Sequence, residues 1–251
     1  LILNSCREEN VIEREPRLDY YIESYEVDDL GFQPLLKVDY EYRESGELDK
    51  YTVLSYAPDK DAMVEQRYFV FSYANDRVGQ LKGYLPDAAT PYIEYSYQYV
   101  ESNEVSKIAE VNHGTGINSE ANFTYAEDGT VKVSYVFSNG GSFQYEFDFA
   151  TGNILNDKTT RGAQLCSDGQ YTYDQHPNPF KNLGYVDYLL TNICANNRLT
   201  ENVNYVACAF PSLIPESYTY EYNDRGFPVS VTTAYKSAGS VKGSKREFFY
   251  Q

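Results

Sequence analysis

The sequence predicts an all-β protein in which antiparallel β-hairpins form a meander that closes or curls into a soluble barrel-like sheet, with one irregular insert. Three observations lead to this fold class. Aromatic and polar residues alternate in many short segments, which is the period of a β-strand. Asn, Asp and Gly separate these segments at the spacing of tight turns. The chain has 27 Tyr and 13 Phe but no Trp, and such rings favour strands.

The strands are expected in order along the chain. Residues 218–232 show the unit best, because alternation up to Tyr222 is followed by Asn-Asp-Arg-Gly and resumes at Phe227. Similar steps, such as Asn-Gly-Gly at 139–141, connect other segments. The expected strand segments are 20–25, 38–42, 48–56, 69–73, 78–81, 93–99, 105–108, 123–125, 131–137, 143–149, 171–173, 218–222, 227–231 and 248–250.

An anchoring aromatic residue recurs along the chain at intervals of 22 to 31 residues, with one interval of 49 that spans two units. This is a degenerate repeat of one hairpin per unit, so roughly a dozen or more strands are expected. Sheets of that size curl or close, which removes exposed edges. The anchoring residues are Tyr42, Tyr73, Tyr97, Tyr125, Phe147, Tyr173, Tyr222 and Tyr250.

The two faces of the expected strands differ in chemistry. A membrane barrel needs an uninterrupted apolar band toward the lipid. Here one face is rich in Tyr and the other carries Glu, Asp, Ser and Thr. We therefore expect a soluble barrel with the aromatic side chains inside.

The composition limits the partners. Lys and Arg number 21 against 37 Asp and Glu, which gives a net charge of −16. Such a surface repels phosphate backbones and anionic lipid headgroups. Nucleic acid is therefore not expected as a partner.

The first six residues resemble the end of a bacterial lipoprotein signal, in which Leu3 and Ser5 precede a cysteine that becomes lipidated, here Cys6. The alternative is an ordinary terminus with a stray cysteine. If Cys6 is lipidated, residues 1–17 are a signal remnant and tether, residues 18–251 form a single domain, and a lipid anchor is the only membrane attachment. The protein is then extracytoplasmic, on the outer membrane or cell surface, with the periplasmic face left open.

Three further cysteines, Cys166, Cys194 and Cys208, allow one disulfide and one free thiol in an oxidising compartment. A Cys194–Cys208 bridge would close a short loop in the least regular part of the chain, although Cys166 is an equally open partner. The three lack the spacing of a zinc site, so no metal is expected there.

The alternation of aromatic and polar residues is interrupted over residues 174–217, which we interpret as the irregular insert. Two prolines flank Asn178, and residues 185–190 are expected to form one helical turn that Asn178 caps. Irregular segments on a rigid sheet often carry binding sites. The candidate ligand-binding residues of this loop are Asp174, His176, Asn178, Phe180 and Tyr185.

Several short motifs carry a family resemblance: Tyr-Thr-Tyr-Asp at 171–174, Pro-Asn-Pro-Phe at 177–180 and Tyr-Glu-Tyr-Asn-Asp-Arg-Gly-Phe-Pro at 220–228. With the lipoprotein-like start, the chain resembles a Bacteroidetes secreted lipoprotein domain of unknown function with a porin-like fold, and more distantly the tyrosine-aspartate repeats of bacterial surface and toxin shells. It departs from those repeats at 45–46 and 102–103, where Ser-Gly and Ser-Asn replace Asp-Gly. The resemblance implies a barrel-like body at the cell envelope and supplies no catalytic residues.

Catalysis has little support in the residues. The two histidines, His113 and His176, belong to no recognised nucleophile, zinc or phosphate-loop motif. No cofactor is expected, although calcium is an option at the acidic turns with Asp59, Asp61, Asp128 and Asp224.

The sequence therefore favours an envelope-anchored, non-catalytic binding or adhesion lipoprotein whose partner is a glycan, a peptide or an envelope protein. Two alternatives stay open. The first is a polysaccharide hydrolase that uses a carboxylate pair. The second is a structural piece of a surface assembly.

Overall fold

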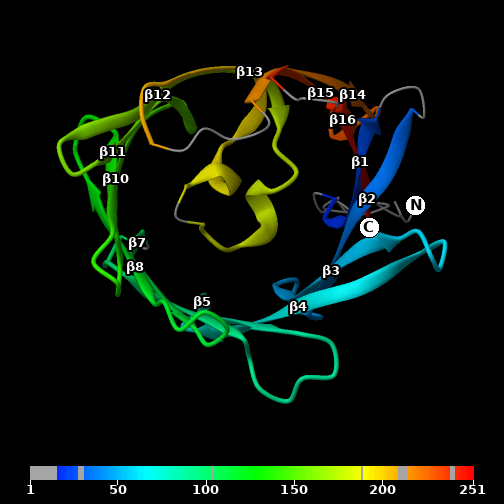
Figure 1. The fold of residues 1–251 in the computed structure, drawn as a ribbon, viewed down its shortest axis with the longest axis horizontal. Coiled ribbons are helices and arrows are strands. Elements are labelled where there is room, and N and C mark those ends of the chain that lie inside the picture. Colours follow the sequence, from blue (N-terminus) through cyan, green and yellow to red (C-terminus); the bar gives the residue numbers. More distant parts are fainter. Residues whose placement is uncertain (1–15, 28–30, 103, 188, 209–213, 238–240) are drawn as a thin grey trace, which may run out of the picture.

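The structure is a computed structural model, which describes residues 16–27, 31–102, 104–187, 189–208, 214–237 and 241–251. It is a closed barrel of sixteen antiparallel strands, each hydrogen-bonded to its neighbours in sequence (Figure 1). This confirms the predicted all-β hairpin meander. The strands are β1 (Leu18–Val27), β2 (Phe32–Tyr42), β3 (Leu48–Ala57), β4 (Ala62–Ala74), β5 (Arg77–Tyr84), β6 (Ile93–Tyr99), β7 (Val105–Asn112), β8 (Ser119–Tyr125), β9 (Thr130–Phe137), β10 (Ser142–Ala150), β11 (Asn153–Arg161), β12 (Gln164–Pro177), β13 (Asn196–Tyr205), β14 (Ile214–Tyr222), β15 (Pro228–Ser237) and β16 (Val241–Tyr250).

The barrel closes where β1 pairs with β16, from Leu18 opposite Tyr250 to Val27 opposite Val241. The weakest seam lies between β13 and β14, where Thr200 opposite Ser217 is the one pairing among the described residues. Closure therefore rests on a long ladder between the two ends of the chain. No helix in the described part of the chain is long and apolar enough to cross a membrane.

The aromatic face of the strands points into the barrel. Tyr40, Phe69, Phe71, Phe123 and Phe147 are all buried. The apolar core falls into two clusters of side chains, one built on β1–β6, β15 and β16 and the other on β7–β11. The prediction that alternation sends rings inward is thereby confirmed.

The outer face carries cross-strand ion pairs. Lysine and glutamate side chains pair across neighbouring strands, directly opposite each other in three cases and diagonally for Lys107 and Glu120. The pairs are Lys50–Glu41 at 2.9 Å, Lys82–Glu94 at 2.9 Å, Lys107–Glu120 at 2.6 Å and Lys132–Glu146 at 3.0 Å. This face is polar around much of the wall.

A tyrosine near the end of one strand donates a hydrogen bond to the carbonyl at the start of the strand before it, and this contact repeats around the barrel. Four of the predicted anchoring residues take part, whereas Tyr99 acts in place of Tyr97. The bonds are Tyr42 to Leu18 at 2.8 Å, Tyr73 to Leu48 at 2.8 Å, Tyr99 to Val78 at 2.9 Å, Tyr125 to Val105 at 2.8 Å and Tyr250 to Pro228 at 2.7 Å.

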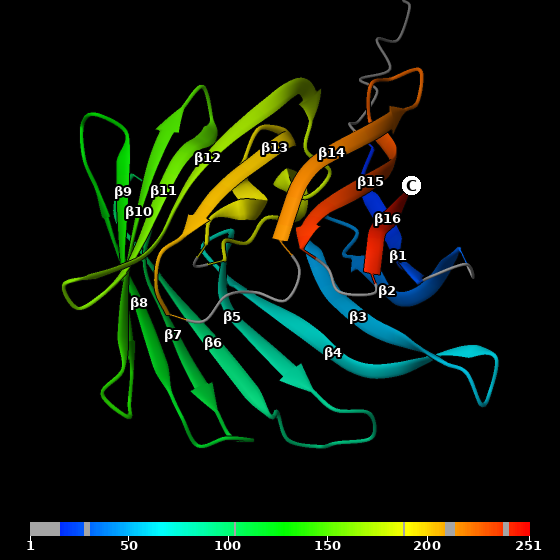
Figure 2. The ribbon, with the colours of Figure 1, turned by 45° about the horizontal axis from the view of Figure 1, so that its top comes forward.

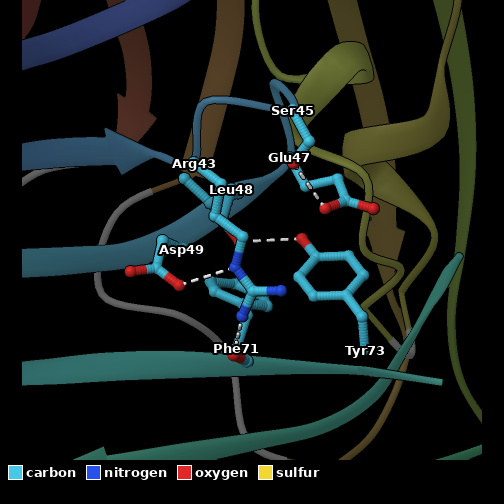
Figure 3. A network of polar contacts seen from close by, with 7 residues as sticks. All are labelled: Arg43, Ser45, Glu47, Leu48, Asp49, Phe71 and Tyr73. Carbon is cyan, nitrogen blue, oxygen red and sulfur yellow. Dashed lines mark hydrogen bonds and ion pairs between the residues drawn. The ribbon is translucent and has the colours of Figure 1, made fainter.

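Figure 3 shows one of these contacts in detail. Arg43 lies over the ring of Tyr73, 4.7 Å from its centroid, and donates to Asp49 at 2.8 Å and to the Phe71 carbonyl at 3.0 Å. The hydrogen bond to Asp49 raises the pKa of Arg43. The turn between β2 and β3 is thus tied to β4.

The irregular insert is shorter than predicted. Strand β12 runs to Pro177 and β13 begins at Asn196, so the insert covers residues 178–195 rather than 174–217. Strand β13 was missed because its sequence, Asn-Asn-Arg-Leu-Thr-Glu-Asn-Val-Asn-Tyr, has no aromatic alternation. Pairing with β12 supplies its hydrogen bonds. The tertiary ladder therefore overrides a weak local pattern.

The predicted helical turn at 185–190 is also wrong. Two short 3₁₀ helices form instead, η2 (Lys181–Leu183) and η3 (Thr191–Ile193). Gly184, at φ 78°, ends the first, and Leu190, at φ 58°, precedes the second. The described residues between them, 185–187 and 189, are not helical.

The disulfide joins Cys166 to Cys208, not Cys194 to Cys208 as predicted. Strand pairing is the reason, because Ser167 lies opposite Tyr205 and the Val206 amide donates to the Cys166 carbonyl at 2.9 Å. The chain after β13 is therefore carried past Cys166. Cys194 is a buried free thiol of the insert.

Candidate functional site

The insert lies inside the barrel, surrounded by the wall (Figures 1 and 2). Two of its aromatic residues hold it there. The ring of Phe180 meets Tyr21 edge-on at 5.7 Å, and that of Tyr185 lies 5.4 Å from Phe71. Leu183 and Leu190 are buried as well. The segment predicted to be a ligand-binding loop is thus a plug in the lumen of the barrel.

Asparagine side chains fix the two ends of this plug. The Asn178 amide donates to the Cys194 carbonyl at 3.0 Å, which joins the start of the insert to its end. The Asn192 amide donates to the Tyr185 carbonyl at 2.6 Å. These bonds satisfy backbone carbonyls that have no strand partner, so the plug keeps a defined shape without regular secondary structure.

A cavity of about 280 Å³, which we call the arginine cavity, lies between the plug and the wall. Its lining combines two arginines and one carboxylate with planar amides and aromatic rings. They come from β1, the plug and strands β12–β16. The residues that matter here are Glu23, Tyr173, Asn178, Phe180, Cys194, Asn196, Asn197, Arg198, Tyr218, Tyr220, Arg246 and Phe248.

Arg246 occupies the centre of the ion-pair network on one side of this cavity. Its Nη2 donates to Glu23 Oε2 at 2.9 Å, and its guanidinium lies 4.9 Å from the ring centre of Tyr21 and 5.6 Å from that of Phe180. Burial alone would lower the pKa of Arg246, but Glu23 together with the neighbouring tyrosines outweighs this effect and the pKa is raised. The group stays cationic while 32% of its side chain remains exposed.

Arg198 forms the second pair. Its Nη1 donates to Glu201 Oε2 at 2.9 Å, and its guanidinium lies 4.1 Å from the ring centre of Tyr171. The Tyr218 hydroxyl donates to the same carboxylate oxygen at 2.9 Å. Burial raises the pKa of Tyr218 and Tyr220, so both hydroxyls stay protonated and able to donate.

The predicted site residues separate into three groups. Asn178 and Phe180 line the arginine cavity. Tyr185 lines a second cavity against β3–β9. Asp174 and His176 line neither.

Asp174 instead connects β12 to β13 and β14 near the ends of these strands. Its carboxylate accepts hydrogen bonds from the Asn197 amide nitrogens at 3.1 Å and from the Tyr222 hydroxyl. The His176 ring stacks on Tyr222 at 4.0 Å.

Glu23, Arg198 and Arg246 were not anticipated. For Arg246 a signal existed, because it shares the two-residue period of Phe248 and Tyr250, so an arginine stands on an otherwise aromatic inner face.

Two of the acidic turn residues, Asp128 and Asp61, have structural roles. Asp128 accepts from the Thr130 amide at 2.9 Å, and this hydrogen bond lowers its pKa. Asp61 accepts from Tyr56 at 2.6 Å. Across the described ranges, no three His, Cys, Asp or Glu side chains are grouped as metal ligands.

No family model matches the chain, and no curated protein matches it in sequence. Among solved structures it is similar to a porin-like protein from Bacteroides uniformis ATCC 8492, at 13% identity and a TM-score of 0.43, over 93% of this chain and 98% of that one. It is also similar to a porin-like protein from Bacteroides vulgatus ATCC 8482, at 14% identity and a TM-score of 0.47, over 94% of this chain and 99% of that one.

Proposed function

We propose that this protein is a non-catalytic binding protein of the cell envelope that holds a sugar unit of a glycan in the arginine cavity. The observation that carries the proposal is the lining of that cavity, in which charged and amide side chains stand beside aromatic rings between the plug and the wall. Such a mixture is rare in a simple core, because buried charges are costly unless they are paired.

The chemistry of the lining suits hydroxyl groups. A sugar hydroxyl donates one hydrogen bond and accepts others, so it matches a site with both kinds of partner. Arg198 and Arg246 donate, Glu23 accepts, and Asn178 and Asn197 do both. Ring faces such as Phe180 and Tyr220 suit the apolar C–H faces of a sugar. At about 280 Å³, the cavity lies near the lower end of small-ligand sites, which fits one end of a glycan.

Binding is favoured over hydrolysis by the number of carboxylates. A glycosidase of the usual kind needs two that flank the scissile bond. Glu23 is the one carboxylate among the described lining residues of this cavity, and it is already paired with Arg246. Its Oε2 already accepts a hydrogen bond from Arg246, which suits recognition better than acid–base catalysis.

Two features support an extracytoplasmic location. The Cys166–Cys208 disulfide belongs to an oxidising compartment. The lysine–glutamate pairs of the outer wall suit a surface in water better than a lipid-facing band, so a lipid on Cys6 would be the attachment. Cys6 itself lies outside the described residues. Cys6→Ala should release the protein from membranes, and continued membrane association of this variant would contradict the anchor.

Binding is tested by a glycan array followed by isothermal titration calorimetry. The variant Glu23→Gln with Arg246→Gln replaces the ion pair by two amides and should weaken binding at least about tenfold, since hydrogen bonds to charged groups contribute about 1.5–3 kcal/mol. The matched control is Glu41→Gln with Lys50→Gln, the same change on the outer wall, which should bind as the unaltered protein does. Equal affinity of both double variants, or no glycan ligand at all, would refute the proposal.

A further inference from the structure

A second cavity of about 240 Å³ lies on the other side of the plug, against β3–β9, and shares no described lining residue with the arginine cavity. We call it the tyrosine cavity. In Figure 1, strands β3–β8 stand across the plug from β12–β16. Its rings are those of Tyr51, Phe69, Tyr95, Tyr97, Tyr135 and Tyr185.

Two carboxylates also line this cavity, and both have neutral partners. Glu110 accepts from the Ser119 hydroxyl at 3.2 Å and from the Tyr135 hydroxyl at 3.4 Å. Asp187 accepts from the Thr191 hydroxyl at 2.9 Å and from the Thr191 amide at 3.3 Å. Among the described lining residues there is no lysine or arginine.

The two carboxylates of the tyrosine cavity differ from the glutamates of the outer wall and of the arginine cavity in their partners. On the outer wall Glu41, Glu94 and Glu146 each have a lysine partner, and in the arginine cavity Glu23 has Arg246. A carboxylate away from bulk water without a cation is costly. Burial raises the pKa of Asp187, which is the expected effect of such an uncompensated charge.

The faces of aromatic rings carry partial negative charge and therefore attract cations. This attraction is strongest where water is excluded. Rings together with unpaired carboxylates therefore select a positively charged group whose surface is largely apolar. A hydrated metal ion is a poorer match, because calcium takes six to eight oxygen ligands and magnesium six. Besides the two carboxylates, the described lining offers side-chain oxygens only as the hydroxyls of Ser119 and five tyrosines, and hydroxyls are not among the usual ligands of either ion.

We propose that the tyrosine cavity binds an organic ammonium ion, of the methylated amine class, with Glu110 and Asp187 supplying the charge and the rings of Tyr51, Tyr97 and Tyr185 the surface. The proposal rests on a separate set of residues from the glycan site. Either one can therefore fail without the other.

The test uses the full chain and isothermal titration calorimetry with three small molecules. Tetramethylammonium and choline carry the charge, and 3,3-dimethylbutan-1-ol has the shape of choline without it. Both cations should bind at a single site, and the alcohol should bind at least about tenfold more weakly, the size expected for a cation on desolvated rings. Equal binding of choline and the alcohol, or no saturable binding of either cation, would overturn the proposal.

Variants locate the site. Glu110→Gln with Asp187→Asn should weaken choline binding at least about tenfold, because the charge is lost while the hydrogen-bonding shape remains. Glu127→Gln is the matched charge control, since Glu127 is exposed on the turn after β8. Tyr185→Phe should retain binding and Tyr185→Leu should lose it, with circular dichroism confirming that each variant folds. Choline binding unchanged by the double variant would place the cation elsewhere and refute the assignment.

Discussion

Glu23 and Arg246 lie 223 positions apart in the sequence, yet they stand directly opposite each other in the β1–β16 ladder and form an ion pair at 2.9 Å. The pair joins the first strand to the last on the inner face of the wall. It therefore contributes both to barrel closure and to the lining of the arginine cavity.

The first prediction concerns the stability of this pair. Glu23→Gln alone should lower the free energy of unfolding by about 1–3 kcal/mol, below the usual cost of breaking a buried pair because Arg246 remains partly exposed. Glu23→Gln with Arg246→Gln should cost less than the two single changes together. Urea denaturation of the double-mutant cycle measures this coupling. Strictly additive single changes would show that the pair makes no joint contribution.

The second prediction concerns the repeated tyrosine contact. Tyr73→Phe removes the hydroxyl that donates to the Leu48 carbonyl and keeps the ring beneath Arg43. The expected loss is about 1 kcal/mol of unfolding free energy, the usual net contribution of one hydrogen bond. Tyr68→Phe serves as the control, because Tyr68 stacks on Tyr84 at 5.2 Å without a hydroxyl bond in the described structure. An equal loss in both variants would contradict a specific role for the contact.

The third prediction separates backbone strain from steric clash at two turn glycines. Gly129 and Gly140 share a φ of 89°, which side chains other than glycine rarely adopt. A Cβ at Gly129 would lie 2.8 Å from the Phe149 carbonyl oxygen, whereas one at Gly140 would meet nothing within 4 Å.

Gly140→Ala should therefore cost about 1–2 kcal/mol, the strain of left-handed backbone alone. Gly129→Ala should cost distinctly more, because the clash is with backbone that cannot turn aside. Comparing the thermal unfolding of the two variants separates the cost of backbone strain from the cost of the steric clash. Similar melting temperatures would mean that the β8–β9 turn relaxes at little cost.

The fourth prediction concerns pH. Burial places the pKa of Asp187 in the folded state above its ordinary value of 3.8. Between these two values the folded state retains a proton that the unfolded state releases, so Asp187 makes stability fall as pH rises through this interval. Below 3.8 both states are protonated and the effect vanishes.

Asp187→Asn should remove this pH-dependent loss of stability. Its stability relative to the unaltered protein should increase as pH rises from about 4 toward neutrality. Thermal unfolding across this range, with Glu127→Gln as the control, measures the difference. A constant offset at all pH values would show that the carboxyl of Asp187 does not titrate differently in the folded protein.

Most strand segments and turns could be predicted because their causes are local, whereas β11 and β13 lack aromatic alternation and were missed. A period of two residues places Phe143, Tyr145 and Phe147 on one face, and glycine or asparagine at a turn accepts positive φ with no help from the rest of the chain. The inward direction of the rings follows from the same pattern, since one face must be buried. These features were determined by the sequence alone.

The closed ladder, the disulfide, the plug and the cavity were decided only by the tertiary structure. Cys166 meets Cys208 because β12 and β13 pair, and Phe180 turns inward because the closed wall offers Tyr21 and Phe248 as neighbours. Glu23, Arg198 and Arg246 have no common local pattern. The physical reason is that closure joins residues whose separation along the chain leaves no trace in a strand's own alternation, so the cavity exists only once the first strand pairs with the last.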